Sequence, residues 1–280
     1  MKLPLLADET FLAAVGAARQ LPDQLHLWWL GQSGFLVQWR DRHLLLDPYL
    51  SDAITEKSAQ SGAPRVRMTA RVVDPVRLDF IDIVASTHNH ADHFDPETLL
   101  TLQRANSDLV LVVPEAIRSF VVERLGCEPG WPVGLNDGES MEIAGFRLTA
   151  VPAAHETLDR DESGRYRYLG YVVRCGPWTL YHSGDTVLYT GIERRLRPFN
   201  IDIALLPING RASERRVAGN LDGREAAELA HAIGAELVIP CHYDMFEFNT
   251  STPDLFQETC RNLGQPYTIL QNGEHWSGSK

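Results

Sequence analysis

The chain has 280 residues and 44% of them are hydrophobic, so it is long enough to bury a large core within one α/β domain. No stretch of the sequence reaches the ~20 apolar residues that a membrane-spanning helix requires, and the amino-terminal segment lacks the apolar centre of a signal peptide. We therefore expect a cytoplasmic protein with no membrane partner. The formal net charge of −11 disfavours nucleic acid as a partner, because following a phosphate backbone requires a broad basic face. The sequence leaves a homo-oligomer open.

The first elements follow from the period of the apolar residues and from turn residues. Residues 7–20 predict an amphipathic helix, and residues 25–52 predict consecutive strands that turn near 31–34 and 40–42. Residues 53–78 contain Ser, Gly, Pro and Arg without a clear period, which predicts a long loop or lid rather than core.

Strands and helices alternate in the rest of the chain, which favours a single α/β domain over residues 1–280. Strands are predicted at 80–86, 109–114, 141–153, 168–185, 201–208 and 235–240. Helices are predicted at 98–106, 114–126, 223–234 and 254–264. The first of these helices has a clear start, because Asp95 is a capping residue and Pro96 suits the first turn.

One internal similarity connects the two halves of the chain. Residues 30–48 and 169–185 each predict a hairpin whose second strand leads to an acidic residue, Asp47 in the first half and Asp185 in the second. This pattern is consistent with two related halves or with two ordinary hairpins.

The stretch THNHADHFD, residues 87–95, places several potential metal ligands on the loop between a predicted strand and a predicted helix. His88 and His90 are two residues apart, so in an extended chain both imidazoles point to one side. Asp92 and His93 follow a turn and are better placed to hold a second ion. Without a cation, these packed imidazoles and the carboxylate would repel one another or lack partners. The spacing therefore predicts a two-metal site.

Three more candidate ligands lie at the ends of predicted strands: His155, Asp185 and His242. Taken singly, each histidine is more simply read as a hydrogen-bonded residue at a strand end. A metal role for these three residues is supported only because the sequence also contains the cluster of potential ligands at 88–93. His182, three residues before Asp185, is the best candidate for an outer residue that orients a ligand. Asp47 is either a turn residue before Pro48 or a residue that supports the metal loop.

THNHADHFD matches the H-x-H-x-D-H signature of the metallo-β-lactamase superfamily. More narrowly, the segments WWLGQSGFLV, LDPYLSD, LYHSGDT and VIPCHYDMF resemble the branch of ascorbate-6-phosphate lactonase-like hydrolases, and the resemblance covers residues 27–245. It implies a four-layered αβ/βα sandwich with the site at one edge, between two β-sheets.

The resemblance also implies a role for each ligand residue. The first ion would be held by His88, His90 and His155. The second would be held by Asp92, His93 and His242, and Asp185 would bridge the two ions. In the resembled family an aspartate at the place of Asp47 supports the metal loop. Imidazole and carboxylate ligands suit Zn²⁺, and Mn²⁺ or iron is compatible with the same set.

Two ions close together lower the pKa of a water that they share, so a metal-bound hydroxide is expected as the nucleophile. Asp92 is predicted to orient this hydroxide or to accept its proton. The leading prediction is a hydrolase that acts on a small anionic lactone, such as a sugar-acid phosphate lactone, or on a phosphoester or phosphodiester. A nuclease is disfavoured by the acidic chain. A metal-binding protein without hydrolytic activity is the third class that remains open.

An acidic protein must meet an anionic substrate with local positive charge. Asn209 and Arg211 follow the strand predicted at 201–208, and they are predicted to project beside the ions and bind a phosphate or a hydroxyl. Alternatively, Asn209 belongs to a turn and Arg211 is solvated. A second basic group, comprising Arg65, Arg67 and Arg71, lies in the predicted lid, but Arg211 is preferred.

Overall fold

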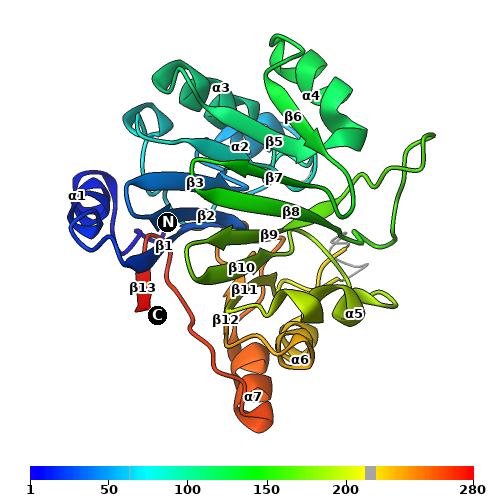
Figure 1. The fold of residues 1–280 in the computed structure, drawn as a ribbon. Helices are drawn as coiled ribbons and strands as arrows, with labels where there is room; N and C mark the ends of the chain where they lie inside the picture. Colours follow the sequence, from blue (N-terminus) through cyan, green and yellow to red (C-terminus); the bar gives the residue numbers. More distant parts are fainter. Residues whose placement is uncertain (63, 212–218) are drawn as a thin grey trace.

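Two β-sheets stacked face to face form the centre of the molecule, and helices cover the outer face of each sheet (Figure 1). This computed structural model describes residues 1–62, 64–211 and 219–280. The layers confirm the four-layered αβ/βα sandwich that the resemblance implied. Within the described residues, every helix falls short of the length and apolar character needed to span a lipid bilayer.

The first sheet comes mainly from the amino-terminal half of the chain, and its strand order is β13-β1-β2-β3-β4-β5-β6. The strands are β1 (Gln24–Gly31), β2 (Gly34–Trp39), β3 (Arg42–Leu46), β4 (Ile83–Ala85), β5 (Val110–Pro114), β6 (Pro132–Leu135) and β13 (His275–Ser279). The helices of this half are α1 (Asp8–Ala18), α2 (Ala53–Ser58), η1 (Pro75–Arg77), α3 (Pro96–Ala105), η2 (Glu115–Ile117) and α4 (Arg118–Leu125).

The second sheet has the strand order β12-β11-β10-β9-β8-β7. Its strands are β7 (Ser140–Ile143), β8 (Phe146–Pro152), β9 (Leu169–Cys175), β10 (Trp178–His182), β11 (Ile203–Pro207) and β12 (Leu237–Cys241). The helices of this half are α5 (Ile192–Leu196), η3 (Arg197–Phe199), α6 (Gly223–Ile233) and α7 (Asp254–Leu263).

The two sheets repeat one topology. In the first sheet, β1, β2 and β3 are antiparallel neighbours, and β3, β4 and β5 run parallel. In the second sheet, β8, β9 and β10 are antiparallel neighbours, and β10, β11 and β12 run parallel. The hairpin β2–β3 thus corresponds to β9–β10, the two segments that resemble each other in sequence. This shared order favours two related halves over two unrelated hairpins.

Alternate residues of β1 contribute to two separate cores. Leu27 and Trp29 belong to the core between the sheets, whereas Trp28 and Leu30 belong to the core beneath α1, α3 and α4. A strand that is buried on both faces needs apolar residues at nearly every position. This explains the unbroken apolar character of LWWL in the sequence.

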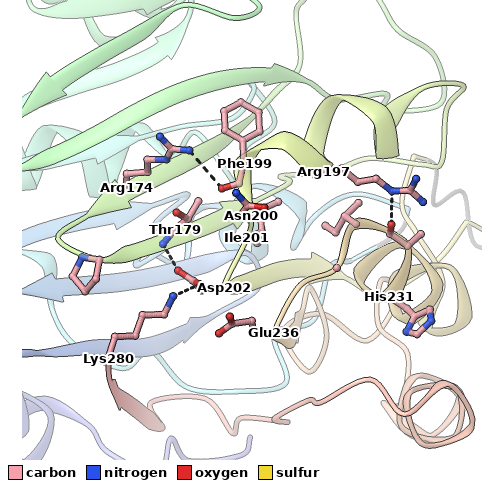
Figure 2. A pocket seen from close by; sticks show the side chains of 14 residues that line it. Arg174, Thr179, Arg197, Phe199, Asn200, Ile201, Asp202, His231, Glu236 and Lys280 are labelled. Carbon is pink, nitrogen blue, oxygen red and sulfur yellow. Dashed lines mark hydrogen bonds and ion pairs between the residues drawn. The ribbon is translucent and has the colours of Figure 1, made fainter.

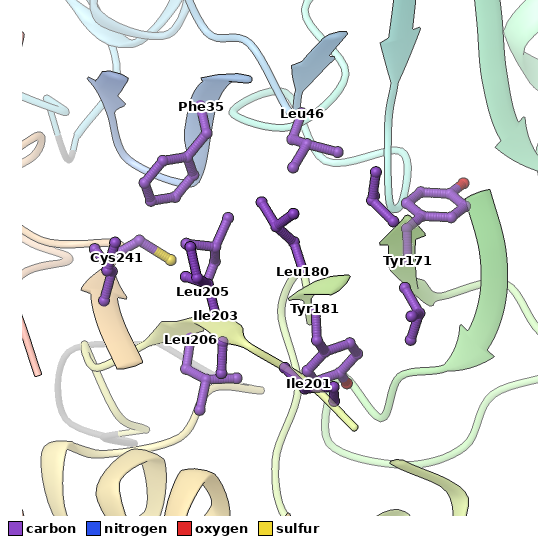
Figure 3. Close-up of a cluster of buried hydrophobic side chains, with 14 of the residues drawn as sticks. Phe35, Leu46, Tyr171, Leu180, Tyr181, Ile201, Ile203, Leu205, Leu206 and Cys241 are labelled. Atoms are coloured by element: carbon purple, nitrogen blue, oxygen red, sulfur yellow. The ribbon is translucent and has the colours of Figure 1, made fainter. Parts of the chain in front are cut away.

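The core between the sheets lies directly behind the strand ends that carry the candidate site. Phe35 and Leu46 point from the first sheet toward Leu180 and Leu205 of the second (Figure 3). All four side chains are fully buried. Because a close-packed core resists displacement, it fixes the two sheet edges relative to each other.

The segment predicted to be a loop or lid, residues 53–78, contains the short elements α2 and η1 and contributes to the core. Val72 and Val73 are fully buried beneath the helices. The backbone N–H of Met68 donates to the carbonyl of Met245 at 2.8 Å. The prediction that this segment lies outside the core is therefore wrong. The sequence did not reveal its buried residues, because its apolar residues lack the period of a helix or a strand.

Candidate metal centre

Six strands end at the edge of the sandwich where the candidate site residues gather. β1, β3 and β4 have one direction in the first sheet, and β8, β10 and β12 have one direction in the second. Each is followed by a residue or segment of the site: Gln32, Asp47, residues 87–95, His155, Asp185 and His242. A site built where several strands end draws residues that are distant in the sequence to one rigid edge.

A tight turn divides the ligands that follow β4 into two sets. The N–H groups of His93 and Phe94 donate to the carbonyl of His90 at 3.0 and 2.7 Å. This turn directs the ligand atoms of Asp92 and His93 into a separate group, although the His93 ring still lies 4.1 Å from the His88 ring, measured between centroids.

All seven residues that the sequence nominated as ligands come together in two adjacent groups. The first group consists of His88, His90, His155 and Asp185, and the second consists of Asp92, His93 and His242. Within each group, the potential ligand atoms all lie within 4.8 Å of one another.

Asp185 lies between the two groups and offers one carboxylate oxygen to each. Its Oδ2 is 3.7 Å from Nε2 of His155 in the first group. Its Oδ1 is 3.2 Å from Nε2 of His93 and 3.4 Å from Nε2 of His242 in the second group. Asp185 is thus placed so that one carboxylate oxygen faces each group.

Several of these atoms are buried and have no hydrogen-bond partner among the described residues. They include Nε2 of His88, Nε2 of His93 and Oδ1 of Asp185. Nε2 of His93 and Oδ1 of Asp185 lie 3.2 Å apart, so they can pair only when that nitrogen carries a proton, and Nε2 of His88 would still be unpaired. An unpaired buried polar atom costs ~1 to 3 kcal/mol, so these atoms need a common explanation. Divalent cations would satisfy all three, and the imidazole and carboxylate donors suit zinc, manganese or iron. The residues therefore fit a metal centre.

The electrostatics of the site couple its carboxylates to its imidazoles. Burial disfavours the charged form of Asp185, but the imidazoles of His242 and His93 outweigh this effect and hold its pKa well below the ordinary value. Burial lowers the pKa of His93, yet the carboxylates of Asp185, Asp47 and Asp92 raise it well above its ordinary value. These buried carboxylates require nearby positive charge, which protonated imidazoles or bound cations supply.

Asp47 lies behind the metal loop, where the resemblance implied a supporting aspartate. Its Oδ2 accepts hydrogen bonds from Nδ1 of His93 at 2.8 Å and from Nε2 of His182 at 2.9 Å, taking each imidazole as the donor. The backbone N–H and the hydroxyl of Thr87 also donate to this carboxylate, each at 2.7 Å. His182 therefore contacts Asp47, which in turn contacts the candidate ligand His93. This is a suitable position for a residue that orients a ligand without binding the metal itself.

Gln32 is a site residue that the sequence analysis missed. Its side-chain N–H group donates to Oδ2 of Asp92 at 2.7 Å and lies 3.2 Å from Nε2 of His242. Its backbone carbonyl accepts the N–H of His242 at 2.8 Å. In the sequence, Gln32 is one residue of a turn. The available signal was a polar side chain placed directly after the apolar run LWWLG, residues 27–31.

Tyr168 and Gly219, also missed, pack around the first group. The Tyr168 ring lies 5.2 Å from the rings of both His88 and His155, measured between centroids. Gly219 has φ +82°, and a Cβ there would lie 1.8 Å from Nδ1 of His155. The Gly219 backbone thus occupies the space beside that imidazole, which only glycine permits.

The predicted substrate residues Asn209 and Arg211 take different positions from those expected. Both guanidinium Nη atoms of Arg211 donate to the carboxylate of Glu225, at 2.7 and 2.6 Å, near the start of α6. Asn209 is buried, and its side chain donates to Asn249 at 2.6 Å. The prediction that both project into the site is wrong, because Glu225 already binds the guanidinium and Asn209 lies behind Asn249.

A pocket of about 260 Å³ opens onto the metal groups. Its described lining includes His90, Asp92, His155 and Asp185 from the ligand set, together with Ile54, Arg65, Ala91, Asn220, Phe246, Phe248 and Asn249. Neither Asn209 nor Arg211 belongs to this lining. Arg65 is the one arginine or lysine among the described residues that line it.

A larger cavity of about 720 Å³ lies elsewhere on the second sheet, next to the amino-terminal ends of β11 and β12 (Figure 2). Several of its polar groups already have hydrogen-bond partners. Asp202 accepts hydrogen bonds from Lys280 and from the N–H of Thr179, and Arg197 donates to the carbonyl of Ala232. None of the metal-type clusters found in the described residues lies there, so this cavity is separate from the candidate centre.

The fold and the ligand set define a metal-dependent hydrolase. The chain belongs to the β-lactamase superfamily, because residues 42–243 match the family model for the beta-lactamase superfamily domain. A UPF0173 metal-dependent hydrolase from Methanopyrus kandleri is 28% identical over 257 residues, which cover 90% of this chain and 99% of that protein. A second, from Methanosphaerula palustris, is 29% identical over 254 residues and covers 89% and 98%.

Solved structures share the same fold. An isothiocyanate hydrolase from Delia radicum gut bacteria has a TM-score of 0.72 at 20% identity and covers 91% of this chain and 100% of that one. Igni18, a metallo hydrolase from Ignicoccus hospitalis, has a TM-score of 0.67 at 20% identity and covers 92% and 99%. At these identities the similarity shows the fold alone.

Proposed function

We propose that the protein hydrolyses a small anionic lactone, such as a sugar-acid phosphate lactone, at a centre of two divalent ions. The observation that carries the proposal is Asp185, which presents one carboxylate oxygen to each ligand group. A single-metal protein has no need of a carboxylate that faces two sets of imidazoles.

Different residues of the chain would hold each of the two ions. One ion would be held by His88, His90 and His155. The other ion would be held by Asp92, His93 and His242, and Asp185 would contact both ions. Zinc or manganese suits this set, and iron is compatible with it. When bound, two such ions lower the pKa of a shared water and polarise a substrate carbonyl or phosphoryl oxygen.

Asp92 is the residue best placed to handle a proton. It lies in the pocket lining, and Gln32 donates to its Oδ2 at 2.7 Å. That hydrogen bond fixes the carboxylate where it can orient an attacking water and accept its proton. Asp47 and His182 would act behind the ligands by holding His93 in position.

The pocket supports a small substrate. Its volume of about 260 Å³ lies just below the range of roughly 300 to 1,000 Å³ for small-molecule sites. The lactone is preferred because the sequence resembles the lactonase-like branch. Phosphoester and phosphodiester hydrolysis is the second candidate, since the same centre would polarise a phosphoryl oxygen.

The test combines metal analysis with a substrate screen. Metal content per chain would be measured on the purified protein, and hydrolysis would be assayed on phosphorylated lactones, neutral lactones and phosphodiesters. We expect close to two ions per chain, lactone hydrolysis that stops on chelation, and loss of both metal and rate in Asp185→Ala. Hydrolysis that persists without metal would refute the proposal. Stable binding of two ions without hydrolysis of any ester would instead identify a non-hydrolytic metal protein.

A further inference from the structure

Apart from Ala91 and Asn220, the described residues that line the metal pocket fall into two sets with different chemistry. One set supplies the candidate ligands. The other comes from two segments far apart in sequence, residues 54–65 and 246–249, and contains Arg65, Phe248 and Asn249 beside two apolar side chains. The side chains of the second set are not among the candidate metal ligands, so they can contact the substrate.

Among the three arginines of residues 65–71, the structure leaves only Arg65 with an uncommitted guanidinium. Arg67 is buried and donates to Asp52 at 3.0 Å, and Arg71 donates to Asp74 at 3.1 Å. In the part of the chain that the structure describes, no carboxylate forms an ion pair with Arg65. Its guanidinium lies over the ring of Phe248, 5.0 Å from the centroid.

The backbone around Arg65 is held in place before any ligand binds. Its N–H donates to the hydroxyl of Ser58 at 2.8 Å, and its carbonyl accepts the hydroxyl of Thr55 at 3.0 Å. The next residue, Val66, accepts the N–H of Glu247 at 3.1 Å. The segment that carries Arg65 is thus bonded to the segment that carries Phe248, which lowers the entropy cost of binding.

The aromatic side of this wall has a rigid base. Tyr49, Ile54, Met245 and Phe246 form a buried cluster, and Phe248 packs against it. Asn249 is held from behind by Asn209. The wall therefore offers one oriented cation, one amide and a flat apolar surface.

We propose that Arg65, stacked on Phe248 and flanked by Asn249, is the subsite that binds the anionic group of the substrate. This inference rests on the proposed hydrolysis of a small lactone and names its substrate class: a lactone that carries a phosphate or a carboxylate on a compact, partly apolar ring. A guanidinium on an aromatic face is already oriented to form two parallel hydrogen bonds with such a group. The ring would rest against Ile54 and Phe246 while its ester bond faces the metal groups.

The test compares charged and neutral lactones on the metal-loaded protein. Three lactones of similar size would be used, one with a phosphate, one with a carboxylate and one neutral. We expect Arg65→Gln to raise KM for at least one charged lactone by ~10-fold or more and to change the neutral lactone less than about 2-fold. Arg71→Gln, in the same segment but outside the pocket, should change none of them. Added salt should raise KM for the charged lactone in the unmodified protein but not in Arg65→Gln.

The two charged lactones identify which anion is preferred. Equal losses for charged and neutral lactones in Arg65→Gln would overturn the subsite, because a shared loss indicates a structural role. Absence of turnover on all three lactones would count against the proposed function alone. Equilibrium binding of the same lactones to the metal-loaded protein would then decide the subsite, which requires weaker binding of a charged lactone to Arg65→Gln and unchanged binding of the neutral one.

Discussion

The carboxylate of Asp47 lies 2.8 Å from Nδ1 of His93, on the opposite side of the ring from the nitrogen that faces the metal groups. A hydrogen bond at Nδ1 fixes the tautomer, so that the lone pair of Nε2 is available to a cation. Asp47 is fully buried, and the four hydrogen bonds that it accepts leave its side chain one orientation. Asp47 thus fixes the orientation of the His93 ring, so that Nε2 faces the second group of candidate ligands.

Asp47→Asn should weaken binding of the second ion by ~10- to 100-fold, because the amide cannot accept from all of the same donors. The measurement is metal content after equilibration in metal buffers of decreasing free concentration. Asp202→Asn is the matched control, since Asp202 is a buried aspartate that also accepts a backbone N–H but lies at the other cavity. Equal metal affinity in both variants would show that Asp47 only stabilises the fold.

Gln32→Ala removes the donor that holds Asp92 at 2.7 Å. We expect the second ion to bind ~10-fold more weakly and the first to be unaffected, because Gln32 contacts only members of the second group. Stepwise titration with cobalt, followed by its visible absorption, would separate the two binding events. Gln38→Ala is the control in the same hairpin, where the amide donates to the carbonyl of Arg40 instead. A parallel loss at both steps would contradict the assignment.

Gly219→Ala should abolish metal binding by the first group of ligands, whereas the second group should still bind its ion. The new methyl group would lie 1.8 Å from Nδ1 of His155, so the imidazole would have to leave its position. The control is Gly264→Ala, because Gly264 also has a positive φ, +67°, yet a methyl group there would meet no heavy atom of the described residues within 4 Å. Both variants bear the backbone cost of ~1 kcal/mol for alanine at positive φ. Metal stoichiometry near one per chain in Gly219→Ala alone is the expected result, and two in both variants would disprove the packing argument.

The ligand set could be predicted from the sequence because its information is local. His88, His90, Asp92 and His93 lie within six positions, and the other ligands each follow an apolar strand. Strand ends are visible in a sequence, and parallel strands bring them to one edge. This is why the structure brings the seven predicted ligands together, whereas the predicted substrate residues lie elsewhere.

What the sequence could not reveal depends on contacts between distant segments. Arg211 looked free in the sequence, but it binds Glu225 at the start of α6. Arg65 looked like a loop residue, but it stacks on Phe248, which lies 183 positions further along the chain. Strand β13 also escaped prediction, because its sequence HWSGS is weakly apolar and becomes a strand by pairing with β1 at the sheet edge.

His43 predicts how stability depends on pH. Its side chain is fully buried, neither ring nitrogen has a hydrogen-bond partner among the described residues, and its ring packs edge-on against Phe80. Burial, reinforced by the charge of Arg19, lowers the pKa of His43 from 6.5 to about 4. Between these two values the unfolded chain binds more protons than the folded one. The contribution of His43 is therefore complete above pH 6.5 and is lost as the pH falls toward 4.

His43→Leu should remove this dependence. Between pH 7 and pH 5, the free energy of unfolding of the unmodified protein should fall by ~1 to 2 kcal/mol more than that of His43→Leu, because leucine does not titrate. Denaturant unfolding at the two pH values would measure the difference, with the metal content of both proteins held equal. His231→Leu, at an exposed position on α6, is the control for the replacement of a histidine by leucine. If His43→Leu and the unmodified protein lost stability equally on acidification, protonation of His43 would not be the cause.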